Sequence, residues 1–295
     1  MRHAITPVRN PDPNILLLIF ATLVVSVGYF YTVTDRCWRG VMSCFDNLGA
    51  AAPAPFRYRI LAPLLEGVFN PTNEPYRAYI IDALFHGFLV ALLVPGLYLW
   101  LKRFLEPSRA VLGVFILALG FMLSFQLYMP FGSTIIELVL LVFALNMIDK
   151  SFGIYALLVG VAAINRETSL VLVVLYAAWW GRAGLQRSFA LAVLWAVITS
   201  LLHIVLGYAP HIYGFENTLE RNLSSIAQAV LCQSPFVILW IMTAYGYPSA
   251  PQVLKWFAVI ALLYGITVIV GAMWIEVRLL MVIFPLVLPT ALRTR

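Results

Sequence analysis

Charged side chains are scarce in this chain. Asp, Glu, Lys and Arg make up 11% of its 295 residues, whereas hydrophobic residues make up 62% and the mean hydropathy is +0.93. Ordinary soluble domains carry about 25% charged residues. So much apolar surface excludes a soluble enzyme, a secreted disulfide scaffold and a disordered chain. The remaining class is a polytopic membrane protein, and the length of the apolar runs favours helices over the ~10-residue alternating segments of outer-membrane strands.

Cysteine and recognisable soluble-enzyme motifs are scarce too. The three cysteines are Cys37, Cys44 and Cys232, and none forms a CxxC pair, so neither a zinc site nor a redox site is expected. The sequence has no P-loop, no GxSxG and no dinucleotide-binding fingerprint. The net charge of +6 is explained by membrane topology, so no nucleic-acid partner is expected.

Apolar runs of the length that crosses a bilayer predict eight full transmembrane helices. They are Asn14–Val33, Ala78–Leu101, Ala110–Tyr128, Ser133–Ile148, Phe189–Leu206, Ile226–Tyr245, Trp256–Ile275 and Leu279–Leu292. The fold class is therefore all-α, a single transmembrane domain over residues 1–295.

A further apolar stretch, 154–180, is interrupted by Asn165-Arg166-Glu167-Thr168. As one span it would put Lys150 and Arg182 on opposite sides of the membrane. As two half-depth helices that turn back, it gathers most Lys and Arg on one face, as the positive-inside rule requires. We therefore predict a half-depth hairpin, both termini in the cytoplasm, and the inner membrane of a bacterium as the location. The loop 34–77 then lies on the outer face.

This outer loop contains candidate catalytic and binding residues. Asp35 and Asp46 are its acidic candidates, and Arg57 and Arg59 lie in a mixed apolar and basic segment, 56–69, that is typical of an interfacial helix. Two interpretations stay open for this helix. It anchors the chain to anionic headgroups, or it forms one wall of an active site.

Two Arg-Glu pairs are further binding candidates. Arg166 and Glu167 lie at the hairpin tip, where the pair either satisfies the turn locally or presents Arg166 to a phosphate in a cavity. Glu276 and Arg278 precede the last span, where they either snorkel to the interface or bind phosphate, with Glu276 orienting Arg278.

A third group lies inside predicted spans. Asp82 and His86 are four residues apart on one helix face, and Glu137 could join them. Such a group could form a proton relay or a metal site, but the spacing matches no metal signature, so structural hydrogen bonding is the favoured interpretation and no metal is expected.

The order of these features resembles the GT-C superfamily of integral membrane glycosyltransferases, which includes protein O-mannosyltransferases and lipid A aminoarabinose transferases. An acidic first outer loop with an interfacial helix is followed by Gly160-Val161-Ala162-Ala163-Ile164-Asn165-Arg166-Glu167-Thr168, similar to a short-helix motif of that family. Glu276-Val277-Arg278-Leu279-Leu280 is similar to the motif that precedes its last span. The resemblance departs at Asp46, which is followed by Asn47 rather than by a second acid.

This resemblance implies an inverting transfer of sugar from a polyprenyl-phosphate donor to an acceptor on the outer face. Asp46, or else Asp35, would take the acceptor proton. Arg57, Arg59, Arg166 and Arg278 would hold the phosphate, with Glu167 and Glu276 beside them. No cofactor is implied, and the partners are membrane lipid and the lipid-linked sugar. Two alternatives stay open: a non-catalytic lipid-binding or assembly subunit of a membrane complex, and a transporter or flippase of a lipid-linked or anionic solute.

Overall fold

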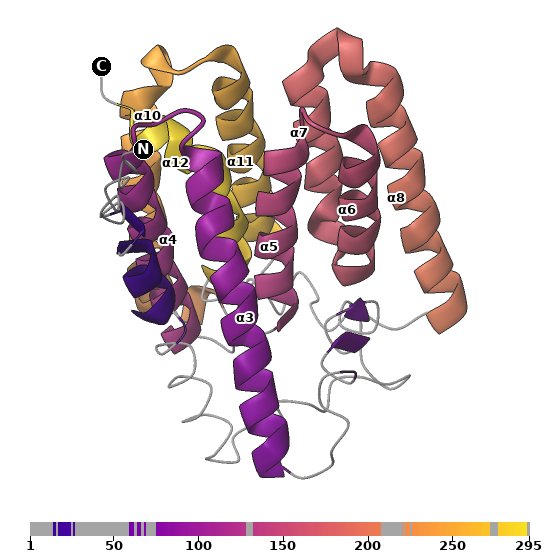
Figure 1. Ribbon diagram of the computed structural model, residues 1–295, viewed down its shortest axis with the longest axis horizontal. Helices are drawn as coiled ribbons and strands as arrows, with labels where there is room; N and C mark the ends of the chain where they lie inside the picture. The colour runs from indigo at the N-terminus through magenta and orange to yellow at the C-terminus, as the bar shows by residue number, and fades with distance from the viewer. Residues whose placement is uncertain are drawn as a thin grey trace, which may run out of the picture.

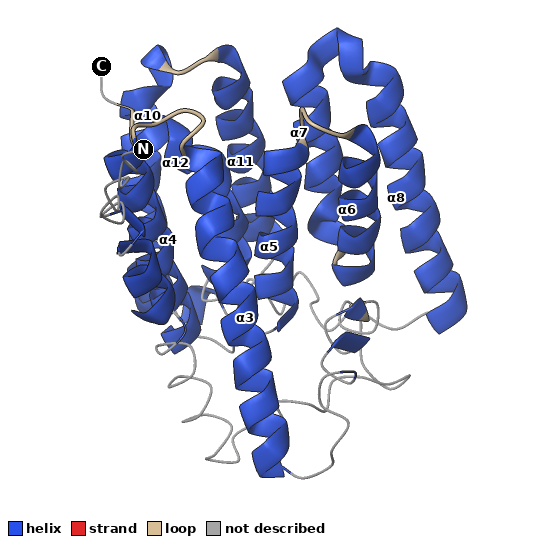
Figure 2. Ribbon diagram, viewed as in Figure 1, coloured by secondary structure: helices blue, strands red, loops and turns tan. Residues whose placement is uncertain are grey.

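The computed structural model describes residues 14–15, 17–24, 26, 59–61, 64–65, 68, 75–127, 132–207, 220, 222–224, 226–271 and 277–293. The elements in this part of the chain are helices joined by short loops (Figure 2). The chain is therefore all-α over the residues described. The helices are α3 (Pro75–Leu101), α4 (Pro107–Leu127), α5 (Gly132–Met147), α6 (Phe152–Asn165), η2 (Glu167–Ser169), α7 (Leu170–Trp180), η3 (Gly181–Gly184), α8 (Leu185–Leu206), α10 (Ile226–Gly246), η4 (Tyr247–Ser249), α11 (Gln252–Gly271), η5 (Val277–Val282) and α12 (Ile283–Ala291).

Three helical segments are long and apolar enough to cross a membrane: Leu84–Leu101, Glu167–Leu206 and Gln252–Val270. The second includes η2, α7, η3 and α8, and it is divided at Gly181, whose φ of +55° ends α7. Shorter apolar helices cover Pro107–Phe121, Ser133–Met147, Phe152–Asn165 and Leu279–Ala291. These helices favour a membrane protein, but they do not reproduce the predicted count of eight full spans.

The predicted last span, Leu279–Leu292, differs most from the structure. It begins in the 3₁₀ helix η5, and α12 is only nine residues long. Pro289 lies inside α12 and lacks an N–H, so the carbonyl of Pro285 loses its intrahelical donor. An apolar run does not distinguish a 3₁₀ helix from an α-helix, so the sequence does not predict this change. The predicted first span and the loop 34–77 lie mostly outside the described residues.

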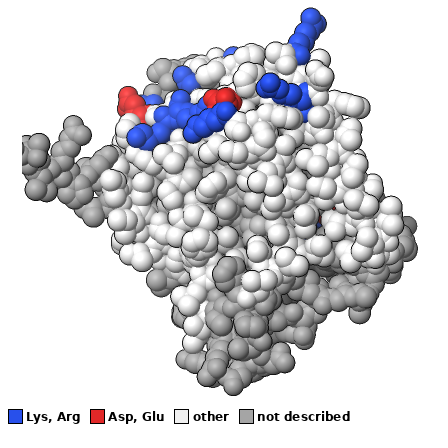
Figure 3. All heavy atoms as spheres, turned by 45° about the vertical axis from the view of Figure 1, so that its right-hand side comes forward, with Lys and Arg blue, Asp and Glu red and all other residues white. Residues whose placement is uncertain are grey.

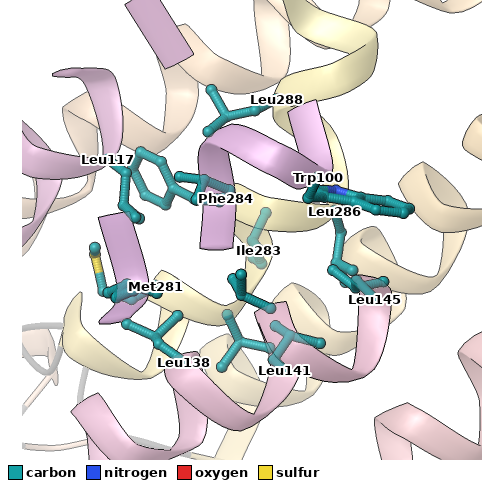
Figure 4. Close-up of a cluster of buried hydrophobic side chains, with 14 of the residues drawn as sticks. Trp100, Leu117, Leu138, Leu141, Leu145, Met281, Ile283, Phe284, Leu286 and Leu288 are labelled. Carbon is teal, nitrogen blue, oxygen red and sulfur yellow. The ribbon is translucent and has the colours of Figure 1, made fainter. Parts of the chain in front are cut away.

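The hydrophobic core surrounds α12. Every residue from Ile283 to Ala291 is buried, and α12 packs against α10, α11, α3 and α4. Figure 4 shows Phe284, Leu286 and Leu288 of this helix among side chains from α3, α4 and α5, including Trp100, Leu117 and Leu141. In contrast, α8 packs mainly on α6 and α7 and keeps large apolar side chains such as Ile204 and Val205 exposed. An exposed apolar helix of this kind is suited to contact with lipid.

The turns between α3 and α4, α5 and α6, α7 and α8, and α10 and α11 lie at one end of the bundle, at the top of Figure 1, together with the end of α12. This arrangement collects basic side chains that are far apart in the sequence (Figure 3). They are Lys102, Arg103, Arg109, Lys150, Arg182, Arg187, Lys255 and Arg293, and we call this region the cationic end.

Trp100 compensates for the proline in α12. Its fully buried indole donates from Nε1 to the carbonyl of Pro285 at 2.8 Å, the carbonyl that Pro289 leaves without a donor. We expect Trp100→Phe to lower the free energy of unfolding by about 1–3 kcal/mol, because a buried carbonyl then lacks its partner. Adding Pro289→Ala restores a backbone N–H, so the Trp100→Phe change should cost less in that background. Unfolding in detergent micelles measures this double-mutant cycle. Strictly additive effects would contradict it.

Candidate functional site

The candidate site is built around the turn between α6 and α7. Arg166 adopts an extended conformation, with φ −162° and ψ 146°, and ends α6; η2 then leads into α7. The two helices lie beside each other, and the turn points away from the cationic end (Figure 1). The polar run from Asn165 to Thr168 interrupts an otherwise apolar sequence here, and each polar group at the turn must find a partner within the protein.

An ion pair between Arg166 and Glu137 is the main interaction at this turn. Arg166 Nη1 lies 2.5 Å from Glu137 Oε2, and the two side chains are 1% and 7% exposed. Glu137 lies on α5, which packs against α6. Two opposite charges held this closely stabilise each other at a place that water does not reach. The pair therefore ties the hairpin tip to α5. Arg166 forms its ion pair with Glu137 rather than with the neighbouring Glu167, so the local Arg166–Glu167 alternative is not what the structure shows.

Further polar contacts fix both partners of the ion pair. The hydroxyl of Thr168 donates to Glu137 Oε1, so both carboxylate oxygens are bound. Arg166 Nη1 also lies 3.5 Å from the hydroxyl oxygen of Thr134. Asn165, the residue before Arg166, donates from Nδ2 to the carbonyl of Ser133 at 2.8 Å. The start of α5 and the tip of the hairpin are thus joined by several hydrogen bonds, and the guanidinium is held in one orientation.

One edge of the Arg166 guanidinium donates no hydrogen bond to the described part of the chain. Within the described part of the chain, Nε and Nη2 are buried and have no hydrogen-bond partner, and neither has Oδ1 of the adjacent Asn165. Nε and Nη2 together form a fork that matches two oxygens of a phosphate or carboxylate. Leaving such donors buried without a partner costs free energy. The geometry therefore suits an oxyanion that binds Arg166 from the side opposite Glu137.

Tyr264 and Arg59 lie near this pair. The hydroxyl of Tyr264 on α11 donates to the carbonyl of Leu279 in η5 at 3.1 Å, and Tyr264 is within electrostatic range of Glu137, Arg166 and Arg59. Arg59 is half-buried. The 3₁₀ helix η5 also packs against α5, the helix that carries Glu137. The site thus brings together residues from four distant segments of the sequence.

The other predicted site residues are placed only in part. Asp35, Asp46, Arg57 and Glu276 lie outside the described residues. The backbone of Arg278 belongs to η5, but its side chain is outside the description, as is that of Asp82. Glu167 is half-buried in η2. Arg59, Arg166, Glu167 and the backbone of Arg278 are therefore the parts of the predicted site that the structure locates.

The pairing of Glu137 was missed by the sequence analysis, which grouped Glu137 with Asp82 and His86. In the described residues the partners of Glu137 are Arg166 and Thr168, and no group of three His, Cys, Asp or Glu side chains is placed to hold a metal ion. The signal was present in the sequence as two opposite charges in neighbouring apolar helices. An intramembrane charge normally has a partner, but the sequence does not say which one.

Comparison with protein-family models, with curated proteins and with solved structures finds no match for this chain. The GT-C resemblance therefore remains a prediction from the sequence, and any function must be argued from the site itself.

Proposed function

We propose that the protein is a polytopic membrane glycosyltransferase that moves a sugar from a polyprenyl-phosphate donor to an acceptor hydroxyl. Transfer takes place at the face opposite the cationic end, in a GT-C-like bundle of about eight spans with both termini in the bacterial cytoplasm. The order of the sequence motifs supports this proposal. The observation that carries it is the buried, unpartnered Nε–Nη2 edge of Arg166 at the tip of the hairpin.

Arg166 suits the phosphate of such a donor. When the bond between the sugar and the phosphate breaks, negative charge develops on the departing phosphate oxygen. A buried guanidinium already oriented toward that oxygen stabilises the charge in the transition state. Glu137 supplies the orientation, because its Oε2 accepts from Nη1 while the hydroxyl of Thr168 holds its Oε1. The opposite edge of the guanidinium is then left for the ligand. Arg57, Arg59 and Arg278 are proposed as further phosphate contacts.

The remaining step is the proton transfer. The acceptor oxygen attacks the anomeric carbon, the bond from that carbon to the phosphate oxygen breaks, and the acceptor proton moves to a carboxylate. Asp46 is the proposed base and Asp35 is the second choice. Glu276 is proposed to orient Arg278, and Glu167 is proposed as a further substrate contact. The displacement is a single step, so it inverts the anomeric configuration and needs neither a covalent intermediate nor a cofactor.

The decisive variant is Arg166→Lys. Lysine keeps the positive charge beside Glu137 but has no fork of two donors, so the fold should persist while phosphate stabilisation is lost. We expect sugar transfer to fall by about 10²–10³-fold, the usual effect of removing a donor that stabilises developing charge. The measurement is transfer from polyprenyl-phosphate mannose and polyprenyl-phosphate aminoarabinose in proteoliposomes, with the unfolding midpoint recorded alongside.

Arg182→Lys is the matched control, because Arg182 is exposed at the cationic end and far from the hairpin tip. It should transfer sugar at the wild-type rate. Wild-type transfer by Arg166→Lys would remove Arg166 from the site. A wild-type chain that binds these donors without transferring sugar would instead favour a lipid-binding subunit. Movement of the intact donor between leaflets would favour a flippase.

A further inference from the structure

The cationic end concentrates positive charge from segments that are far apart in the sequence. Its basic side chains come from the ends of α3 and α12, the starts of α4, α8 and α11, the α5–α6 turn and η3. Among the described residues of this end only Glu106 and Asp149 are acidic. In Figure 3 the blue side chains gather at this end, and the surface below them is white. The basic residues thus lie together at one end of the bundle, above a face that shows few charged side chains.

Several of these cations lie in cation–π contact with aromatic rings. Lys102 Nζ lies 5.3 Å from the ring centre of Tyr98, and Lys255 Nζ lies 5.6 Å from that of Tyr247. The guanidinium of Arg187 lies 5.5 Å from the ring of Phe152. These rings keep the charged groups close to the bundle surface, an arrangement that is typical of side chains at a membrane interface.

Arg103 has a different role. Its guanidinium lies over the rings of Trp100 and Trp179, donates to the carbonyl of Leu145 and forms an ion pair with Asp149. It therefore joins α3, α5 and α7 by direct contacts. Of the ion pairs within the described residues, only this one lies at the cationic end. The charges of Lys102, Lys150, Arg182 and Arg187 are exposed and are not neutralised by an acid in this part of the chain.

We propose that the cationic end, apart from Arg103, whose charge Asp149 neutralises, is a binding surface for anionic phospholipid headgroups, with phosphates of the surrounding leaflet lying between neighbouring Lys and Arg side chains. The arrangement fits lipid because the charges gather at one end of a bundle whose helices, α8 among them, expose large apolar side chains along their length. A phosphate between two cations offsets their mutual repulsion, and headgroup phosphates are present at high local concentration at this level. The proposal rests on membrane insertion and does not depend on sugar transfer.

The test uses the purified full-length chain in nanodiscs that contain phosphatidylcholine and an increasing share of phosphatidylglycerol. The lipids retained per protein after detergent extraction are counted by native mass spectrometry at about 0.15 M salt, where charges separated by more than about 8 Å are screened. We expect the chain to retain phosphatidylglycerol preferentially. The variant with Lys102→Gln, Lys150→Gln, Arg182→Gln and Arg187→Gln should lose this preference by at least tenfold, because each basic residue near an anionic surface contributes about fivefold.

The matched control is Arg103→Gln with Asp149→Asn, which leaves the net charge unchanged and should keep the wild-type lipid preference. If the fourfold variant does not fold, the pairs Lys102→Gln/Lys150→Gln and Arg182→Gln/Arg187→Gln are measured separately, and each should give a partial loss. A fourfold variant that retains phosphatidylglycerol as the wild type does would overturn the proposal. So would an equal loss of both lipids, or displacement of phosphatidylglycerol by millimolar inorganic phosphate.

Discussion

Replacing Glu137 with leucine is expected to lower the free energy of unfolding by about 3–5 kcal/mol, the cost of leaving a buried charge without its partner. Arg166 is 1% exposed, and its guanidinium cannot reach solvent without moving the hairpin tip. The hydroxyl of Thr168 would lose its acceptor at the same time. Unfolding of the purified protein in detergent micelles, followed by circular dichroism, measures the loss.

The double variant Glu137→Leu with Arg166→Leu is the sharper measurement. Removing both charges leaves an apolar contact between α5 and the hairpin, which is often as stable as a buried ion pair. The double variant should therefore be more stable than either single variant, with a coupling of more than about 2 kcal/mol. Glu106→Leu is the control, since Glu106 is exposed, and it should change stability by less than about 0.5 kcal/mol. Additive effects of the two single variants would contradict a tight ion pair.

This double variant also separates structure from function. If the pair only tied the hairpin to α5, a stable double variant would keep full sugar transfer. The proposed function requires that it fold and still transfer no sugar, because the Nε–Nη2 edge of Arg166 is gone. Stability and activity therefore respond independently, and a defect in transfer cannot be attributed to loss of the fold.

Much of the helical layout could be predicted from the sequence because apolar length is a local property. The predicted span Ala110–Tyr128 corresponds to α4, and Ser133–Ile148 corresponds to α5, within a few residues. The interruption at Asn165–Thr168 is just as visible, because polar residues in an apolar run require a turn or a partner. The change from η5 to α12 was not predictable in this way, since both helices lie in one continuous apolar run. The hydrogen bond from Trp100 of α3 to the carbonyl of Pro285 is a long-range contact that the run does not show either.

The candidate site was predicted less completely, for a physical reason. Hydropathy shows that Glu137 and Arg166 each need a partner, but the partner is determined by which turns lie side by side in the fold. Glu137 precedes Arg166 by a whole helix and a turn, and only the return of α6 along α5 brings them together. Helical spacing instead favoured Asp82 and His86 as neighbours of one another. Long-range pairs of this kind can be predicted only when the packing of the helices is known.

Gly246→Ala is expected to be among the most damaging conservative substitutions in the chain. A Cβ at this position would lie 1.9 Å from the carbonyl oxygen of Thr290 and 2.9 Å from its carbonyl carbon. These are backbone atoms at the contact between α10 and α12, so no side-chain rotation can relieve the overlap, and the two helices must separate. We expect a loss of about 3 kcal/mol or more, at the upper end of the range for overpacking. Thermal unfolding in micelles measures this loss.

Gly87→Ala in α3 provides the comparison, because a Cβ there would meet no atom within 4 Å. In a helix interior alanine is favoured over glycine by about 0.5–1 kcal/mol, so this variant should be as stable as the wild type or slightly more stable. The two substitutions add the same methyl group to a helical glycine, and only the surroundings differ. A wide separation between their unfolding midpoints would show that small residues let α10 approach α12. Equal midpoints would mean that the two helices are not in close contact at Gly246.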